Sequence, residues 1–325
     1  MVAQKGSRWW IAWGILLLLP VTGSSEEVLR LANPTTFLTG LITLAKHRQL
    51  FAHHDLSVTL LGMPTGDEAL QAVEENRADL ASTAETAFTL RCLANPSWRA
   101  VAQIGDWDNE VRILARRDAG INMPKDLRGK RIATQNRLSS FFFLEQYLMK
   151  QGFTLRDIIP VFLPSKELAA ALVNKEVDAI SSRDPFLSHA KKQLADQALE
   201  LAAPGLYRKT FLLAGQAHTM ENKKSAIIHL LQALIQTEQF VREQPETARK
   251  LLQQHHADEA DLQRIWSEIR LGVWLDHHLV LTMEQVAEWA MRNRMVPAGK
   301  IPNFSANIDR QPLQSVRPIA INLVQ

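Results

Sequence analysis

The sequence predicts an α/β protein built from two similar lobes, and three observations carry this prediction. From residue 28 onward, short strand-like runs alternate with helix-like stretches of about ten to fifteen residues, the pattern of strand–helix units around a largely parallel sheet. The chain has 325 residues, of which 46% are apolar, so it is long enough to bury two hydrophobic cores. The segments 68–85 and 167–184 also resemble each other.

The first residues have the order of a secretory signal. Lys5 and Arg8 precede the apolar run 9–19, and a short stretch of small residues follows. We therefore expect 1–23 to be a signal peptide, and the remaining protein to be soluble outside the inner membrane. A membrane anchor is the alternative, but the run covers only about half of the roughly 20 residues that a spanning helix needs.

The strand and helix elements follow from periodicity and capping. Apolar residues at helical spacing predict a helix over 38–45, and the Thr65 to Glu68 capping box predicts a second helix over 69–75. Strands are predicted at 28–32, 57–61, 79–82, 99–104, 131–134, 159–162 and 177–181. Later helices are predicted at 225–241, 257–270 and 282–294.

The internal similarity supports two related lobes. Both segments begin with Glu, and in both an Asp (Asp79 or Asp178) opens the strand and a pair of hydroxyl residues closes it. In both, an acidic residue follows, Glu85 in the first and Asp184 in the second. The alternative is that any two helix–strand units look this similar.

Two facing α/β lobes would place a ligand site outside the carboxyl ends of their strands, where helix N-termini point free N–H groups inward. Four loops qualify: 33–37 and 82–85 from the first lobe, 135–140 and 182–184 from the second. Their hydroxyl, amide and charged groups suit a small polar ligand.

Composition excludes several classes of protein. The formal net charge is only +3, from 37 basic and 34 acidic residues, far below the basic balance of a nucleic-acid-binding protein. The single cysteine, Cys92, cannot form an internal disulfide or a thiolate metal cluster. Three adjacent histidine pairs occur, but neighbours in a helix or strand point in different directions and rarely share a metal. No catalytic motif is present, so we expect neither a cofactor nor enzymatic activity.

Several segments, in order, resemble one family. The stretch Asp126–Ala133, the Ser139-Ser140 helix start, Leu172–Asp178 and Asp184-Pro185-Phe186 resemble the nitrate, sulfonate, taurine and thiamine-precursor group of periplasmic solute-binding proteins of ABC importers. The segment Leu41–Leu60 is similar to the family's "LAKGYFKEEGLDVEL" stretch.

The resemblance implies a two-lobed type II periplasmic binding protein fold, whose lobes close on a ligand and then dock on a membrane permease. It also implies a discontinuous first lobe, 26–112 plus 215–300, around a second lobe at 113–214, with crossing strands at 111–115 and 210–214. Residues 301–325 have little periodicity, and we expect an irregular tail.

The chain departs from the family's pattern at two places. Leu138 stands where the family often has Gly before the second-lobe helix, and Arg183-Asp184-Pro185 stands where Trp-Glu-Pro is common. The second change replaces an aromatic wall by a guanidinium, which suits bidentate recognition of a carboxylate or sulfonate.

These observations predict a monomeric protein that binds a small organic anion or zwitterion, such as a sulfonate, and delivers it to an ABC permease. Glu85 or Asp184 would serve an amine of that ligand. A thiamine-precursor pyrimidine is the second candidate ligand. A periplasmic ligand-sensing subunit of a signalling receptor is the alternative role. The candidate ligand-binding residues are Thr35, Thr36, Phe37, Ser82, Thr83, Glu85, Trp107, Asn136, Arg137, Ser139, Ser140, Arg183 and Asp184.

Each candidate residue has a plainer explanation. Ser139 and Ser140 could only cap a helix, and Asp184 could cap the helix that Pro185 opens. Arg183 could be solvated, or paired with Glu85 or Asp184. Thr35, Thr36 and Asn136 are ordinary turn residues. Trp107, the best candidate for an aromatic lid, could instead pack in a hinge.

Overall fold

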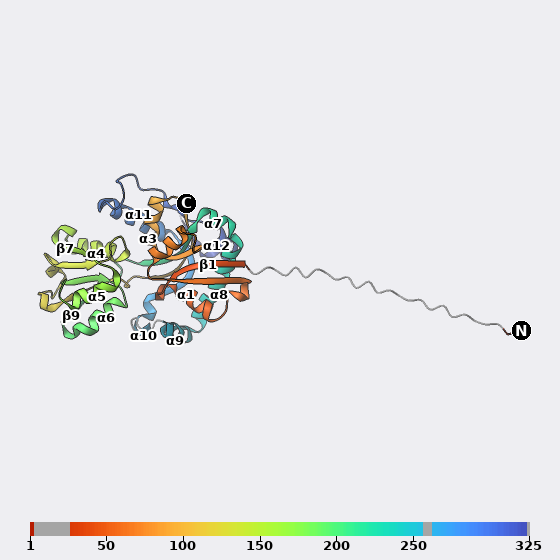
Figure 1. The fold of residues 1–325 in the computed structure, drawn as a ribbon, viewed down its shortest axis with the longest axis horizontal. Coiled ribbons are helices and arrows are strands. Elements are labelled where there is room, and N and C mark those ends of the chain that lie inside the picture. Colours follow the sequence, from red (N-terminus) through yellow and green to blue (C-terminus); the bar gives the residue numbers. More distant parts are fainter. Residues whose placement is uncertain (3–26, 256–261, 324–325) are drawn as a thin grey trace.

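A computed structural model describes residues 1–2, 27–255 and 262–323. Nearly all of the predicted signal peptide, and the first part of the helix predicted at 257–270, lie outside these residues. The described chain forms two lobes side by side, each with its own sheet (Figure 1). The predicted α/β class and two-lobed architecture are confirmed.

The larger lobe is built on a seven-stranded sheet in the order β12-β11-β4-β10-β3-β1-β2. Its strands are β1 (Glu27–Pro34), β2 (Leu56–Met63), β3 (Leu80–Ala84), β4 (Trp98–Trp107), β10 (Lys209–Gln216), β11 (Ile269–Asp276) and β12 (Ile321–Asn322). The smaller lobe has a five-stranded sheet in the order β7-β6-β8-β5-β9. Its strands are β5 (Arg112–Arg116), β6 (Arg131–Thr134), β7 (Ile159–Phe162), β8 (Ala179–Ser182) and β9 (Ala198–Leu201).

The two sheets share one arrangement, as the internal similarity predicts. β1 is parallel to β2 and β3, and β10 runs antiparallel beside β3. In the smaller sheet β6 is parallel to β7 and β8, and β5 runs antiparallel beside β8. Both sheets are therefore mixed, because β5 and β10, which follow the passages between the lobes, enter their sheets from the opposite end.

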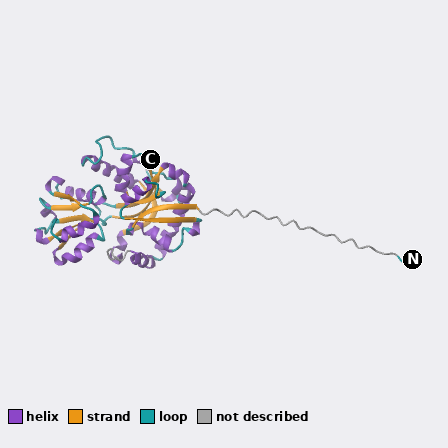
Figure 2. Cartoon of the chain, in the orientation of Figure 1, coloured by secondary structure: helices purple, strands orange, loops and turns teal. Residues whose placement is uncertain are grey.

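Helices cover both faces of each sheet (Figure 2). The larger lobe carries α1 (Gly40–His47), α2 (Gly66–Glu74), α3 (Glu85–Ala94), α7 (Ala217–Asn222), α8 (Lys224–Glu243), α9 (Pro245–His255), α10 (Leu262–Ile265), α11 (His277–Arg292) and α12 (Gln311–Val316). The smaller lobe carries α4 (Ser139–Lys150), α5 (Ser165–Val173) and α6 (Phe186–Leu194). Alternating strand residues fill the two sides of its sheet: Ile113 belongs to one apolar cluster and its neighbour Leu114 to another.

The chain passes between the lobes at 108–111 and at 202–208. The predicted second boundary, at residue 214, is wrong because β10 lies wholly in the larger sheet. Its residues pair with β3 on one side and β4 on the other, as Leu213 does with Ser82 and Ala102.

Helix α11 spans the junction of the lobes. Its first half joins the larger core through Leu279 and Met283, whereas Trp289 and Ala290 belong to the core of the smaller lobe. The end of α11 therefore contacts both lobes, because its large indole packs against Phe141 and Phe142 of α4.

The predicted irregular tail is also wrong for much of its length. Residues 304–307 form a 3-10 turn that buries Phe304, α12 buries Leu313, and β12 pairs in parallel with β11. These short elements carry too few apolar residues for a periodic pattern in the sequence. Among the described residues, no helix combines the length and apolar character needed to cross a bilayer.

Candidate functional site

Three helix N-termini meet between the lobes, where the carboxyl ends of the parallel strands point. α2 follows β2, α3 follows β3 and α4 follows β6. Residues from the first turn or cap of each (Gly66, Ala84, Ser140) line one narrow hollow of about 50 Å3. We call this hollow the cleft floor. Free N–H groups in these first turns favour an anion.

Gly66 allows this convergence. A Cβ at Gly66 would lie 2.7 Å from Thr83 Oγ1 and 2.9 Å from Thr83 Cα, so any larger residue would push α2 away from the β3–α3 corner. Thr65 caps α2, because its side chain accepts a hydrogen bond from Glu68 N at 3.2 Å, as the capping box predicts.

Two cationic side chains also line the cleft floor. Arg183 comes from the loop after β8, and Lys209 is the first residue of β10, so each lobe supplies one of them. The Arg183 guanidinium donates to the carbonyl oxygen of Asp184 at 2.7 Å and has no carboxylate partner among the described residues. Lys209 is only 4% exposed. The floor is therefore lined by two cations, Arg183 and Lys209, together with the carboxylate of Asp67.

Ser139 and Ser140 begin α4 without capping it. The cap is the extended residue Leu138, and no side chain bonds the first-turn N–H groups. The capping alternative for the two serines is therefore wrong. Ser140 is 4% exposed and its Oγ has no hydrogen-bond partner among the described residues, although it lines the floor. A buried hydroxyl without a partner is costly, and a bound ligand would satisfy it.

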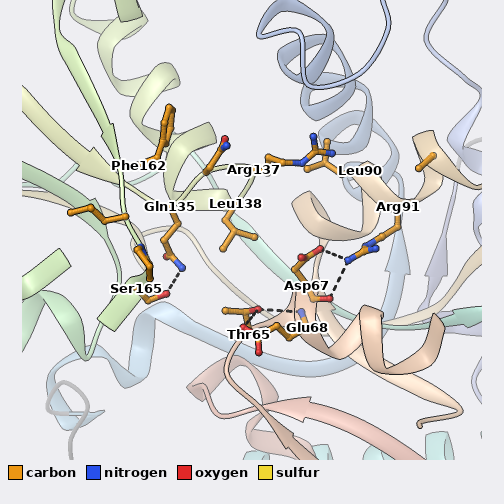
Figure 3. A pocket seen from close by; sticks show the side chains of 14 residues that line it. Thr65, Asp67, Glu68, Leu90, Arg91, Gln135, Arg137, Leu138, Phe162 and Ser165 are labelled. Atoms are coloured by element: carbon orange, nitrogen blue, oxygen red, sulfur yellow. Dashed lines mark hydrogen bonds and ion pairs between the residues drawn. The ribbon is translucent and has the colours of Figure 1, made fainter. Parts of the chain in front are cut away.

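Above the floor lies a wider cleft mouth of about 590 Å3. Figure 3 shows its two walls: Gln135, Leu138 and Phe162 from the smaller lobe face Asp67 and Arg91 from the larger lobe. Arg91 pairs with Asp67 at 2.9 Å and with Glu74 at 2.7 Å. Arg91 and Asp67 at the mouth thus already have partners, whereas Ser140 Oγ at the floor has none among the described residues.

Behind Lys209, a buried network joins the two passages between the lobes. The Lys209 ammonium forms an ion pair with Glu110, which is 4% exposed and lies in the first passage. Thr36 Oγ1 donates to the other oxygen of Glu110 at 3.3 Å. Burial lowers the pKa of Lys209, and the neighbouring Glu110 carboxylate opposes that shift.

Glu85 lies deeper in the same network. Its carboxylate accepts hydrogen bonds from the Tyr207 hydroxyl, from Thr210 N at 2.8 Å and from the Thr86 hydroxyl at 2.9 Å. Complete burial raises the pKa of Glu85, while these donors oppose the rise. Glu85 does not line the cleft and is not available to a ligand amine in this structure.

The candidate residues thus divide into two groups. The structure brings five of them to the cleft: Asn136, Arg137, Ser139, Ser140 and Arg183. Arg137 lies at the exposed mouth and donates to Met295 O at 3.1 Å.

The others do not line the cleft. Thr35 is exposed in the turn after β1, whereas Phe37 packs in the larger core and Thr83 is fully buried. Ser82 donates to Asn33 Oδ1 at 2.6 Å, and Thr36 faces Glu110.

Trp107 and Asp184 do not line the floor, because their side chains are buried and bonded to other residues. Trp107 is 2% exposed and its indole donates to Glu268 Oε2 at 3.0 Å, so it packs beside a passage and is not a lid. Asp184 forms a buried ion pair with Arg112 at 2.5 Å and accepts from Ser188 N at 3.0 Å.

Sequence reasoning missed Lys209 and Gly66 at the floor, whereas Gln135 belongs to the predicted loop 135–140. The capping box at Thr65 could have pointed to Gly66, because it fixes where α2 begins. No local pattern marks Lys209, which reaches the floor only because β10 pairs beside β3.

Catalytic and metal chemistry find little support in the described residues. The described parts of the chain contain no group of three His, Cys, Asp or Glu side chains placed to hold a metal. Cys92 is buried in α3, and burial raises the pKa of its thiol, so it is not an activated nucleophile.

Two α/β lobes with a polar cleft between the carboxyl ends of their strands define the periplasmic-binding-protein class of fold. A family model described as NMT1/THI5 like matches residues 37–248, and the chain belongs to that family.

Comparison with known proteins agrees with this class. The chain is 25% identical over 287 residues to the Escherichia coli (strain K12) protein named "Putative aliphatic sulfonates-binding protein", covering 84% of this chain and 86% of the relative. Its structure resembles the alkanesulfonate-binding protein SsuA from Xanthomonas axonopodis pv. citri bound to MOPS, with TM-score 0.74, 21% identity, and coverage of 88% and 99% of the two chains. Against the periplasmic aliphatic sulphonate binding protein SsuA from E. coli, the TM-score is 0.70, with 22% identity and coverage of 87% and 98%.

The same fold also carries an enzyme. The desulfurization enzyme DSZB matches with TM-score 0.60 and 14% identity, over 89% of this chain and 98% of that chain. The fold alone therefore does not separate binding from catalysis.

Proposed function

We propose that this chain is the exported solute-binding component of an ABC importer and that it binds a small organic anion or zwitterion, of the sulfonate kind, between its lobes. In this proposal, 1–23 is removed on export and the loaded, monomeric protein docks on a permease in the inner membrane. The first lobe and the second lobe close on the ligand about the passages at 108–111 and 202–208.

One observation carries the proposal: Ser140 Oγ is buried and unpartnered among the described residues, at a floor where three helix N-termini meet. Arg183 and Lys209 supply the positive charge that an acid group needs. The groups come from both lobes, so a ligand that contacts them all favours the closed form.

The relatives agree with this ligand class, because three of them are named for binding aliphatic sulfonates or alkanesulfonates. The mouth offers room for an organic tail, and Asp67, which lines both parts of the cleft, would serve a ligand amine. A flat pyrimidine could stack on Phe162 of the mouth or Phe211 of the floor, so the ligand screen includes one.

A ligand screen tests the proposal. Methanesulfonate, taurine, acetate, nitrate, sulfate and a hydroxymethylpyrimidine are added to the mature chain, and thermal unfolding is followed. A true ligand at about 100 times its dissociation constant should add roughly 2.7 kcal/mol to the free energy of unfolding. We expect a sulfonate or other organic acid to give the shift. A shift from the pyrimidine alone, or from none of the panel, would contradict the proposed ligand class.

The role is tested separately. Ligand-dependent capture of an ABC permease is the expected result in a membrane extract, and capture of a signalling receptor instead would favour the sensing alternative. Turnover of the bound compound, followed by mass spectrometry, would show an enzyme.

A further inference from the structure

The ion pair behind the cleft floor has a consequence for which anions the site accepts. Lys209 lines the floor, and its ammonium forms an ion pair with Glu110, which does not itself line the floor. Both side chains are about 95% buried, so their charges are poorly screened by water. An anion at the floor would therefore feel the carboxylate as well as the ammonium.

We infer that Glu110 is a specificity-determining residue: it offsets the charge of Lys209, so that the floor selects a head group with one negative charge over a head group with two. This inference rests on the proposed function, because it concerns the same cleft. Arg183 is then the cation without a carboxylate partner, and one such cation matches one negative charge.

The geometry supports a selective role over a purely structural one. Lys209 belongs to the lining of the floor together with Ser140 and Arg183, so its ion pair with Glu110 lies beside the groups proposed to hold the ligand. Thr36 also donates to Glu110, which fixes the carboxylate behind the ammonium. The second anionic charge of a ligand would lie within range of this carboxylate and be repelled.

The other charged groups around Lys209 do not change this argument. Glu85 and Arg183 both act on Lys209, and Tyr207 covers Glu85 by donating to it. Asp67 lines the floor and pairs with Arg91. None of these groups is altered in the variants below, so differences between variants report on Glu110 and Lys209.

Methanesulfonate and sulfate form a matched pair of probes. Both are tetrahedral at sulfur, but methanesulfonate has three oxygens and a methyl group and carries one negative charge, whereas sulfate has four oxygens and carries two. Dissociation constants for both are measured by calorimetry at the same pH and ionic strength for every variant. The quantity of interest is the ratio of the two constants, because a general loss of affinity cancels in it.

The preference for methanesulfonate over sulfate should fall when the floor becomes more positive and rise when it becomes less positive. We expect the wild type to prefer methanesulfonate by about tenfold or more, and Glu110→Gln to reduce that preference by about tenfold. Lys209→Met should increase the preference while weakening both probes. The double variant Lys209→Met/Glu110→Gln removes both charges and should keep the wild-type ratio.

Two controls separate selectivity from folding. Glu221→Gln makes the same chemical change on an exposed residue of α7, at the end of the larger lobe far from the cleft (Figure 1), and should leave the ratio unchanged. Thermal unfolding without ligand checks each variant. If Glu110→Gln does not fold because it leaves Lys209 buried and unpaired, the double variant, Lys209→Met and the wild type still give three points of the series.

The outcomes separate the two proposals. If methanesulfonate binds the wild type but the ratio is the same in every folded variant, the role of Glu110 is wrong and the proposed function stands. A wild type that prefers sulfate would also overturn the inference. If neither probe nor any other anion binds the wild type, the proposed function fails and the inference fails with it.

Discussion

The first turn of α4 presents two different surfaces, one in the proposed ligand site and one in the packed core, and their comparison shows how substitutions can separate binding from stability. Ser139 and Ser140 line the cleft floor, whereas Phe141 and Phe142 pack against Trp289 of α11 with ring centroids 5.4 and 5.5 Å apart. We call the contact between α4 and the end of α11 the α11 seam. It also includes the ion pair of Arg292 with Glu145, at 2.7 Å.

The floor is charged and narrow, whereas the seam is filled by aromatic rings in edge-to-face contact, and each holds one buried polar atom without a partner among the described residues, Ser140 Oγ and Trp289 Nε1. Burial of rings contributes free energy to the folded state whether or not a ligand is present. An unpartnered buried hydroxyl costs free energy until a ligand satisfies it. In the proposed site, adjacent residues on one helical turn would serve stability and binding separately, and substitutions should separate the two effects.

The largest expected effect is on the seam. Trp289→Ala should lower the free energy of unfolding by about 3 to 5 kcal/mol, because it removes a fully buried indole. Affinity for the ligand, measured on the folded protein, should change by less than about twofold. Denaturant unfolding and calorimetry check both values, with Trp289→Phe as a milder control. If Trp289→Ala lowers the free energy of unfolding by less than about 1 kcal/mol, the α11 seam does not contribute the stability expected of it.

The next effect belongs to the floor. Arg183→Met should weaken ligand binding by about 1.5 to 3 kcal/mol, the range for a hydrogen bond to a charged group, with little change in unfolding free energy. Arg137→Met is the matched control, since Arg137 is exposed at the mouth and should contribute less than about 1 kcal/mol. Equal affinity in the wild type and Arg183→Met would make Arg183 a surface charge.

A smaller effect on affinity is expected at Ser140, and Ser181 provides the comparison. Ser140→Ala should weaken binding by about 0.5 to 1.5 kcal/mol and leave the unliganded protein as stable as before, because its Oγ has no partner to lose among the described residues. Ser181→Ala should lower the free energy of unfolding and leave the affinity unchanged, because Ser181 Oγ donates a hydrogen bond to Ser140 O at 2.8 Å. If Ser140→Ala costs stability but not affinity, the hydroxyl is structural.

The smallest effect is at the mouth. Glu74→Gln removes one exposed ion pair with Arg91 and should change both affinity and unfolding free energy by less than about 1 kcal/mol. The measurements are the same calorimetry and denaturant titrations. A loss of affinity as large as that of Arg183→Met would move the binding site from the floor to the mouth.

Local patterns predicted most of the fold. Strand and helix periodicity located β1 to β3 and β6 to β8, and the similarity of 68–85 to 167–184 predicted two sheets with one arrangement. β10 was placed in the wrong lobe because its sheet is chosen by pairing with β3 and β4, which no local pattern records.

The site was less predictable for a similar reason. The sequence predicted the loops that face the cleft, but the direction of each side chain depends on its partners. Glu85 and Asp184 follow equivalent strands, yet Tyr207 and Arg112 hold them inside the protein. Lys209 comes to the floor from a distant part of the chain, so spacing alone could not identify it.

A crystal structure of the protein grown with methanesulfonate tests the central claim most directly. The account predicts the sulfonate oxygens within about 3.2 Å of Ser140 Oγ and of a nitrogen of Arg183 or Lys209, so that groups from both lobes hold one head group. A sulfonate that contacts residues of one lobe only, or lies in the hollow lined by Asp106, Tyr207 and His278, would contradict it.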